Sequence, residues 1–435
     1  MTEDSIERDA LRILRDLDWQ VLHGPETGPE GTGERGYTDA ALARRLDEAI
    51  HRLNPDIPAL AQAEAIKRVL RSSEPDLILD NRDFHNLLVN GVDVEYRNED
   101  GELRSNKVWL IDTQNPENNE FVAVNQYTMI QGDHHRRPDI VLFVNGLPLA
   151  IIELKDPTDE KATIKSAYNQ LQTYKNEIPS LFRFNELLII SDGIEAEMGT
   201  ISSSFERFLP WKTIDGSKEH TGVPMMEVLL RGACDKRRFL DIIRSFIVFE
   251  RDEEDLTYIK KVAAYHQYWA VNKAITSTLK ATRPESDHRI GVVWHTQGSG
   301  KSLSMVFYAG KLVLEPELKN PTIVVVTDRN DLDDQLFGTF SNCHDLLRQD
   351  PVQALSRDHL QQLLRREAGG IIFTTNAKFF PEGGKDFPLL SDRSNIIVMA
   401  DEAHRSQYNF IDGFAKHIRQ ALPNASFIGF TGTPI

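Results

Sequence analysis

Residues 137–157 of the chain read RPDIVLFVNGLPLAIIELKDP. Two apolar runs are joined here by an Asn-Gly dipeptide, which is typical of a tight hairpin turn. Asp139 opens the first run, and Glu153 and Lys155 close the second. Because successive side chains of a strand point to opposite faces, Glu153 and Lys155 share a face. The stretch therefore predicts a β-hairpin with charged groups at its open end.

The register of this hairpin decides whether Asp139 joins the same face. A clean two-residue loop pairs Asp139 with Ile152 and leaves Glu153 on the opposite face. A three-residue loop, or one β-bulge, pairs Asp139 with Glu153 directly. We predict the second arrangement, and a hairpin with a two-residue loop and no bulge would exclude a shared site.

The three charged residues predict a metal-dependent site. Two facing carboxylates repel each other unless a cation lies between them, and such oxygen ligands suit Mg²⁺. Mg²⁺ stabilises charge on a phosphate and lowers the pKa of a bound water. We therefore predict that Asp139 and Glu153 hold the metal, and that Lys155 positions or deprotonates the attacking water. Charged strand ends on a solvated surface are common, so the prediction depends on the complete P-D…E-x-K pattern.

The same stretch resembles the core of PD-(D/E)xK nucleases. Gln170 and Tyr174, in NQLQTYKN, match the Q-x-x-x-Y signature that follows this core in nucleases similar to the RecB branch. Their spacing places both on one face of a helix, and the resemblance implies that they contact DNA or brace the site. It also implies an upstream helical carboxylate. Glu7 and Glu64 are both candidates; the spacing does not decide between them, and we prefer Glu64.

A second motif predicts nucleotide binding. Residues 290–305 read IGVVWHTQGSGKSLSM, where an apolar strand passes through a glycine-containing turn into a helix. Backbone N–H groups of such a loop, together with the helix start, bind phosphate. Lys301 would reach the β- and γ-phosphates, and Ser302 would hold Mg²⁺. The predicted nucleotide contacts are Thr296, Gln297, Gly298, Ser299, Gly300, Lys301 and Ser302.

The sequence NIIVMADEAH at 395–404 delivers Asp401 and Glu402 at the end of an apolar strand, where parallel sheets bind ligands. We predict that Asp401 holds Mg²⁺ and that Glu402 orients or deprotonates the attacking water. GSGKS followed by DEAH resembles superfamily 2 helicase-like motors, in which translocases also relax the glycine position that His295 occupies here. Further resemblances to such motors are found in 324–335, 373–379 and 429–435, and in Gln267, which is similar to the upstream glutamine that recognises adenine.

The two parts of the chain differ in their apolar pattern. From about Asp83, short runs separated by turns predict a mainly antiparallel sheet. From Arg289, apolar runs alternate with helical stretches, which favours a parallel sheet covered by helices. The predicted fold class is α/β: a PD-(D/E)xK nuclease domain over 1–250, with a mixed sheet flanked by helices, followed by a RecA-like parallel lobe over 251–435. A helical stretch at 239–265 is expected to join the two domains.

Composition limits the function classes. The 435 residues favour two or more domains. A net charge of −16 argues against a protein that coats DNA, so DNA contacts must use local basic stretches such as 134–138 or 235–238, or a partner. The two cysteines, Cys234 and Cys343, form no metal or disulfide pattern. Without a long apolar run or a signal core, we expect a cytoplasmic protein with no membrane contact.

A RecB-like nuclease core followed by such a motor resembles the motor (R) subunit of type I restriction enzymes over nearly the whole chain. The resemblance implies Mg²⁺-dependent cleavage of double-stranded DNA, ATP-driven translocation, and assembly with modification (methyltransferase) and specificity subunits. Two alternatives remain: a helicase-family remodelling protein whose N-terminal domain binds DNA without cutting, and a non-catalytic assembly protein.

The sequence stops at Ile435, directly after TGTPI, and no second RecA-like lobe follows. In the family that lobe supplies an arginine finger, worth roughly 10³–10⁵ in rate. We therefore expect a truncated motor that binds ATP, hydrolyses it slowly and does not translocate by itself.

Overall fold

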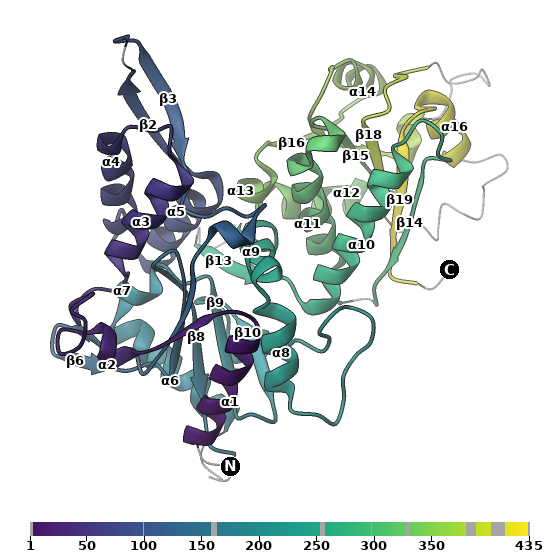
Figure 1. The fold of residues 1–435 in the computed structure, drawn as a ribbon. Coiled ribbons are helices and arrows are strands. Elements are labelled where there is room, and N and C mark those ends of the chain that lie inside the picture. The colour runs from purple at the N-terminus through teal and green to yellow at the C-terminus, as the bar shows by residue number, and fades with distance from the viewer. Residues whose placement is uncertain are drawn as a thin grey trace. The chain divides into compact units, whose positions relative to one another are not determined.

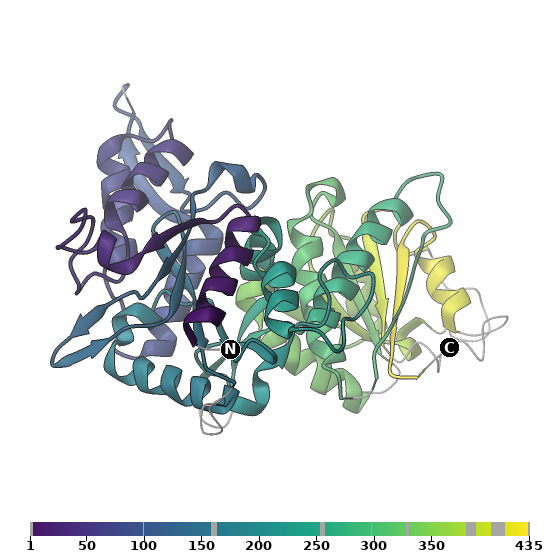
Figure 2. The ribbon, with the colours of Figure 1, turned by 60° about the horizontal axis from the view of Figure 1, so that its bottom comes forward.

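The computed structural model describes residues 3–98, 100–157, 163–252, 257–296, 298–327, 330–379, 389–401 and 414–433. The chain divides into two compact units. Unit 1 comprises residues 1–247 and 257–265, and unit 2 comprises 248–256 and 266–435. The border that the sequence predicts, between residues 250 and 251, falls inside the short segment 248–256. Figures 1 and 2 draw the elements of both units.

Unit 1 is built on a mixed seven-stranded sheet in the order β1-β4-β7-β8-β9-β10-β11. β7 runs antiparallel to β4 and β8, whereas β8 pairs with β9 in parallel. Every residue of β7, β8 and β9 is buried, which explains why these strands read as continuous apolar runs. The strands are β1 (Gln20–His23), β4 (Phe121–Asn125), β7 (Ile140–Val144), β8 (Leu147–Leu154), β9 (Leu187–Ser191), β10 (Ala196–Gly199) and β11 (Leu209–Pro210).

Helices and two small ribbons surround this sheet. The helices are α1 (Glu3–Asp16), α2 (Gly24–Thr27), α3 (Ala43–Leu53), α4 (Ala59–Leu70), α5 (Leu77–Asn90), α6 (Ile164–Glu177), α7 (Pro179–Phe182), α8 (Met225–Ala233) and α9 (Lys236–Ser245), with 3₁₀ turns at Pro116–Asn118 and Phe205–Arg207. The ribbons are β2 (Val92–Arg97) with β3 (Leu103–Val108), and β5 (Met129–Gln131) with β6 (His134–Arg136). α1 packs against β1 and β8, and α6 packs against β8 and β9. The ribbon β2–β3 extends beyond α4 and α5 (Figure 1).

Two sequence predictions are wrong in this region. The run NLLVNGVDVEY at 86–96, predicted as part of the sheet, is a strand only from Val92. Its first part, 86–90, forms the end of α5, which Asp76 caps at its start and Gly91 ends at a φ of 76°. A short apolar run fits a buried helix as well as a strand. The stretch 239–265, predicted helical, contains the end of α9 and then the β-branched strands β12 (Ile247–Arg251) and β13 (Tyr258–Val262).

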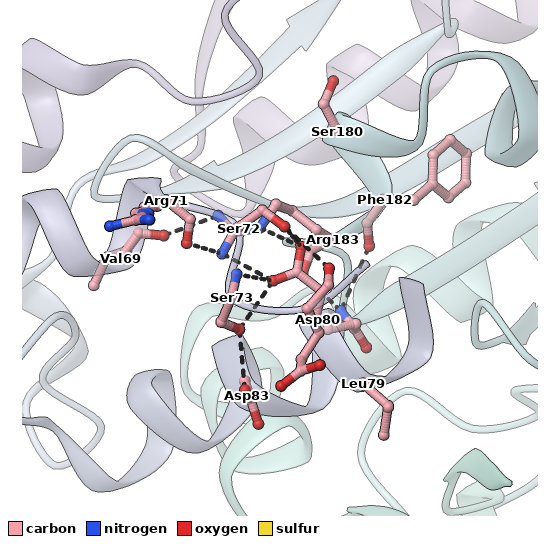
Figure 3. Close-up of polar contacts among 12 residues, drawn as sticks. Val69, Arg71, Ser72, Ser73, Leu79, Asp80, Asp83, Ser180, Phe182 and Arg183 are labelled. Atoms are coloured by element: carbon pink, nitrogen blue, oxygen red, sulfur yellow. Dashed lines mark hydrogen bonds and ion pairs between the residues drawn. The ribbon is translucent and has the colours of Figure 1, made fainter. Parts of the chain in front are cut away.

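Arg183, which follows α7, joins α4 and α5 (Figure 3). Its guanidinium donates to Asp80 at 3.0 and 3.4 Å, and to the carbonyl oxygens of Val69 and Arg71 at 2.9 Å each. Burial alone would raise the pKa of Asp80, but hydrogen bonds from the Ser73 backbone and Arg183 hold it below its usual value. Because the buried charges of Arg183 and Asp80 are paired with each other, the contact fixes the end of α4 against α5.

Unit 2 contains a six-stranded sheet in the order β14-β19-β18-β15-β17-β16, in which all neighbours are parallel. The strands are β14 (Arg289–Trp294), β15 (Thr322–Thr327), β16 (Pro351–Gln353), β17 (Ile371–Thr375), β18 (Ile396–Ala400) and β19 (Ser426–Thr431). The helices are α10 (Tyr265–Ala281), α11 (Lys301–Leu314), α12 (Asn330–Ser341), α13 (His344–Leu347), α14 (Arg357–Leu364) and α16 (Phe414–Ala421), with 3₁₀ turns at Pro316–Leu318 and Asn376–Phe379. Parallel strands joined by helices are the arrangement that the alternating pattern predicts. In such a sheet the C-terminal ends of all the strands lie at the same edge.

Among the described residues, no helix combines the length and the apolar character that crossing a bilayer requires.

Candidate functional site

The turn of the β7–β8 hairpin consists of Asn145 and Gly146, whose φ angles are 51° and 80°. Positive φ at both positions is typical of the type I′ turn that the Asn-Gly pair favours. Gly146 is also required by packing, because a Cβ there would lie 2.4 Å from the carbonyl oxygen of Leu42. The turn therefore fixes the hairpin against the start of α3.

One β-bulge sets the register of the open end. Val144 pairs with Leu147 beside the turn, but the pairing shifts between Leu142 and Phe143, so that Ile140 pairs with Ile152. The next position in this register brings Asp139 opposite Glu153. The predicted bulge is thus confirmed, and both carboxylates lie at the same end of the hairpin.

Both carboxylates are buried, and one of their oxygens lacks a donor. Asp139 is 8% exposed and its Oδ2 accepts a hydrogen bond from the Leu154 backbone N–H at 2.8 Å. Glu153 is 0% exposed, and its Oε1 lies 3.1 Å from the Lys155 Nζ. Among the described residues, no group donates to Glu153 Oε2. A buried carboxylate oxygen without a donor is costly, so this atom requires an explanation.

The pKa values of Asp139 and Glu153 show that too little positive charge lies near the two carboxylates. Burial raises the pKa of Asp139 to about 6, against the lowering effects of the Leu154 N–H and Lys155. Burial, and then the negative charge of Asp139, raise the pKa of Glu153 well above its usual range. Lys155 therefore compensates the two carboxylates only in part, and a bound cation would complete the compensation.

The donor set fits Mg²⁺. No group of three or more His, Cys, Asp or Glu side chains is arranged as a metal site in the part of the chain that the structure describes. Asp139 and Glu153 would therefore contribute two side-chain ligands. Mg²⁺ is commonly held by one or two carboxylates while it keeps several waters, whereas a structural Zn²⁺ needs four protein ligands.

Asp139 lines a pocket of about 750 Å³ whose lining contains charges of both signs. Apart from Asp139, the acidic side chains come from α1, and the basic ones come from β6 and the residue after it. Gln170 and Tyr174 reach the pocket from α6. The acidic and basic lining residues are Glu3, Asp4, Glu7, His135, Arg136, Arg137 and Asp139.

Gln170 and Tyr174 face the pocket together, as their spacing predicts. The Gln170 Nε2 donates to the Tyr174 hydroxyl at 2.5 Å. Burial, and then the charge of Glu153, raise the pKa of Tyr174. The pair therefore lies within the electrostatic reach of the two carboxylates.

The structure does not support the preference for Glu64 as the upstream carboxylate, because Glu64 lies away from the pocket. Glu64 is exposed on α4, which packs against α3 and β2 and contributes nothing to the pocket. Glu7 on α1 lines the pocket, and its carboxylate accepts hydrogen bonds from Asn125, at 2.6 Å, and from Gln126. Residue spacing could not separate the candidates, because packing of α1 on the sheet brings Glu7 to the site.

The two basic stretches have different environments. Arg136 forms an ion pair with Glu177, while Arg137 is exposed and lines the pocket. Arg238, in the stretch 235–238, donates to the carbonyl oxygens of Arg231 and Gly232 at 2.7 and 2.6 Å. This second stretch therefore has a structural role at the end of α8.

In unit 2, the described residues between β14 and α11 include two glycines in the left-handed region and a short hydrogen-bonded turn. Gly298 and Gly300 have φ angles of 84° and 81°, which favour glycine. The Thr296 carbonyl accepts hydrogen bonds from the Ser299 N–H at 3.1 Å and from its hydroxyl at 2.6 Å, which closes the turn. Gln297 lies outside the described residues.

The parallel sheet brings the two predicted nucleotide motifs together. β14 leads into the loop and β18 leads into Asp401, so both reach the same edge. The Lys301 Nζ lies 2.8 Å from the Asp401 Oδ1. Ser302 stands in the first turn of α11 and is half-buried. Glu402 lies outside the described residues.

Gln267 contacts this loop from α10. Its Nε2 donates to the carbonyl oxygen of Gly300 at 3.0 Å and lies 3.3 Å from the Ser304 hydroxyl. The sequence missed two neighbours. His266 reaches the loop from α10, and His295, seen only as a departure from a glycine pattern, has a buried ring near Ser304. Single histidines at such positions give no sequence signal of their own.

Comparison with known proteins agrees with both sets of motifs. Residues 1–207 match the family model of the type I restriction enzyme R protein N terminus, and residues 266–435 match that of the SWI2/SNF2 ATPase. The type I restriction enzyme HindI endonuclease subunit of Haemophilus influenzae is 49% identical over 100% of this chain and 43% of its own length. Two putative type I endonuclease subunits of Methanocaldococcus jannaschii, MjaIXP and MjaVIIIP, are 36% and 29% identical over 99% of this chain and 42% of theirs.

The chain spans less than half the length of these relatives. The family model over residues 1–207 and the relatives that match the whole chain show that this chain is related to the type I restriction enzyme endonuclease subunits and corresponds to the N-terminal portion of an R subunit.

Proposed function

We propose that unit 1 is a PD-(D/E)xK nuclease domain that hydrolyses double-stranded DNA with Mg²⁺. The observation that carries this proposal is the buried Glu153 Oε2 without a donor, at the same hairpin end as Asp139 and beside Lys155. A metal there would supply positive charge to a phosphate and lower the pKa of a bound water.

The proposal gives a role to each residue of the site. Asp139 and Glu153 hold the metal. Lys155, whose Nζ is kept in place by Glu153 and by the Leu154 carbonyl at 2.8 Å, positions or deprotonates the attacking water. Gln170 and Tyr174 brace the pocket or contact DNA.

The pocket lining also supports DNA as the substrate. The net charge of −16 leaves no general attraction for a polyanion. Binding must therefore be local, and His135, Arg136 and Arg137 place basic groups beside Asp139. We assign the phosphate contacts to them, and in particular to Arg137, because its side chain is exposed.

Unit 2 is proposed to bind MgATP and to drive DNA translocation as the first lobe of the motor. Lys301 contacts the phosphates, Ser302 and Asp401 hold Mg²⁺, and Glu402 orients the attacking water. Gln267, which resembles the adenine-recognising glutamine of such motors, stands beside the loop, where its amide contacts Gly300. The loop conformation and the Lys301–Asp401 contact support this assignment. As in the relatives, whose names describe subunits, we expect modification and specificity subunits as partners.

The experiment measures cleavage of supercoiled plasmid by the purified chain with Mg²⁺, with and without ATP and companion subunits. We expect nicked or linear products with Mg²⁺ and none with EDTA. Asp139→Ala and Lys155→Ala should abolish them. Asp133→Asn is the matched control, because this exposed aspartate lies near the site but outside the pocket lining.

Cleavage that persists in Asp139→Ala but disappears in Lys301→Ala would reverse the assignment of the nuclease site. Unchanged DNA binding without cleavage in every condition would favour the alternative, a domain that binds DNA and does not cut it.

A further inference from the structure

The phosphate loop of unit 2 is held from outside by side chains of α10 and α11. His266 and Gln267 stand in the first turn of α10, and Ser304 stands in the first turn of α11. The His266 Nε2 lies 3.2 Å from the Ser299 carbonyl oxygen, and the Gln267 Nε2 lies 3.0 Å from that of Gly300. Two consecutive carbonyl groups of the loop thus each meet a side chain of the same helical turn.

A third contact connects these groups with the end of β14. The His295 Nδ1 lies 3.3 Å from the Ser304 hydroxyl, and the rings of His266 and His295 meet edge to face at 5.3 Å. Burial, and then His266, lower the pKa of His295 to about 4, so its ring is neutral near pH 7. The histidine that replaces a glycine of the usual pattern therefore packs as part of this support.

Because a peptide group is planar, a contact that fixes a carbonyl also fixes the direction of the N–H that follows it, and such N–H groups are what binds phosphate. In a trans peptide the C=O and N–H bonds point in opposite directions. Fixing the Ser299 carbonyl toward His266 directs the Gly300 N–H away from α10. The Gly300 carbonyl accepts the first backbone hydrogen bond of α11, from the Ser304 N–H at 3.0 Å, and Gln267 adds a second donor to it. The two donors together hold this peptide, and with it the direction of the Lys301 N–H. N–H groups that converge in this way are what a phosphate loop offers to its ligand.

We propose that His266 and Gln267 are positioning residues that hold the phosphate loop in its binding conformation before nucleotide arrives. The inference rests on the proposed ATP site and deepens it: Gln267 acts on the phosphate end of the nucleotide, through the loop. The close packing of the Gln267 side chain against the loop supports this, since Gln267 is 6% exposed and a Cβ at position 300 would lie 2.8 Å from its Nε2. Recognition of adenine would require this amide to leave the Gly300 carbonyl.

The first test needs no nucleotide. Hydrogen exchange of the backbone amides at 298–305 is measured in the nucleotide-free chain and in Gln267→Ala and His266→Ala. We expect faster exchange in both variants, and partial recovery in His266→Gln, which keeps a donor. Asn272→Ala is the matched control, because Asn272 connects α10 to Lys311 at 2.7 Å, away from the loop. Exchange in Gln267→Ala that equals the unmodified chain would overturn the proposal.

The second test uses three Mg²⁺-loaded probes: ATP, GTP and inorganic tripolyphosphate, which has no base. A positioning role predicts that Gln267→Ala weakens the binding of whichever probes the unmodified chain binds by the same factor, about five- to tenfold for one hydrogen bond. A loss confined to ATP would overturn the proposal in favour of adenine recognition. If the unmodified chain binds none of the three, the proposed ATP site fails, while the exchange experiment still decides whether the loop is held.

Discussion

At the scale of single residues, Asp139 takes part both in the shortage of positive charge around the carboxylate pair of unit 1 and in the chemistry proposed there. Asp139→Asn removes one of two buried negative charges that no metal compensates. In EDTA at pH 7.5 we expect the variant to be more stable than the unmodified chain, by about 1–3 kcal/mol. Its plasmid cleavage should disappear.

Thermal unfolding with EDTA and with Mg²⁺ measures the first effect. Asp133→Asn, which removes an exposed carboxylate from the β5–β6 turn, controls for net charge and should change neither stability nor cleavage. A metal-free Asp139→Asn chain that is less stable than the unmodified one would contradict the electrostatic argument.

The raised pKa of Asp139 also predicts a pH dependence. The folded chain holds the proton up to about pH 6, whereas the unfolded chain loses it near 3.8. This contribution to stability is therefore complete below about pH 4 and is lost as the pH rises through about 6. Because Mg²⁺ competes with that proton, the stabilisation by Mg²⁺ should be small at pH 5 and grow toward pH 7.5. Melting temperatures across pH 5–8 test this, and a Mg²⁺ effect that is constant over the range would argue against it.

The sequence predicted the carboxylate pair, Lys155 and the nearby Gln170 and Tyr174, but not the long-range contacts that hold the hairpin in place. Asp139, Glu153 and Lys155 are close in sequence, so strand periodicity and one bulge were enough to bring them together. Asn145 shows the limit: it was interpreted only as a turn residue, yet its buried side chain donates to the Leu110 carbonyl at 2.9 Å and accepts from the Glu120 N–H at 2.8 Å. Such contacts depend on loops that only the tertiary fold brings near.

At the scale of elements, β13 is fastened to unit 1 by a buried ion pair. Lys260 is 1% exposed, and its Nζ lies 2.7 Å from the Glu186 Oε2 and 2.9 Å from the Asn81 Oδ1. His85 contacts the same Glu186 oxygen at 2.9 Å. The Lys260 backbone carbonyl accepts a hydrogen bond from Thr200 at 2.7 Å. The segment 257–265 thereby belongs to unit 1 although the preceding residues belong to unit 2.

Lys260→Met tests this attachment. Removing one partner of a buried pair leaves the other charge uncompensated, and we expect a loss of about 3–5 kcal/mol in unfolding free energy. Adding Glu186→Gln should recover part of the loss. Lys261→Met, on the opposite face of β13, is the control and should cost less than about 1 kcal/mol. Urea unfolding of the unmodified chain and the three variants gives these values, and equal stability of Lys260→Met and Lys261→Met would show that the pair does not hold the strand.

The elements that the sequence missed share a physical cause. An ion pair between residues 186 and 260 leaves no local trace, and the run 86–90 is too short for its period to separate a helix from a strand. Five of the strands described in unit 2 were predictable because a parallel sheet produces apolar runs between helices. The three-residue strand β16 was missed because it is too short to form such a run.

At the scale of the whole chain, two units carry two candidate ligand sites with different requirements. In the proposals above, the carboxylate pair in unit 1 would bind a divalent cation, whereas the loop in unit 2 would offer N–H groups and Lys301 to a phosphate. Each unit has its own sheet and its own buried core. Unfolding of the chain is therefore expected to depart from a two-state transition, so ligand effects must be assigned to each unit separately.

Hydrogen exchange with peptide resolution makes that assignment. Mg²⁺ alone should slow exchange in the peptides of unit 1 around β7 and β8, and ATP added to Mg²⁺ should slow those of unit 2 around the phosphate loop. A ligand at a hundred times its dissociation constant stabilises its unit by about 2.7 kcal/mol, or roughly a hundredfold in the exchange of globally protected amides. Asp139→Asn should abolish the first effect and keep the second, and Lys301→Ala should do the reverse. Lys280→Ala, an exposed lysine at the end of α10, should leave both unchanged. Protection of unit 2 by Mg²⁺ alone, or of unit 1 only when ATP is present, would show that the two sites have been assigned to the wrong ligands.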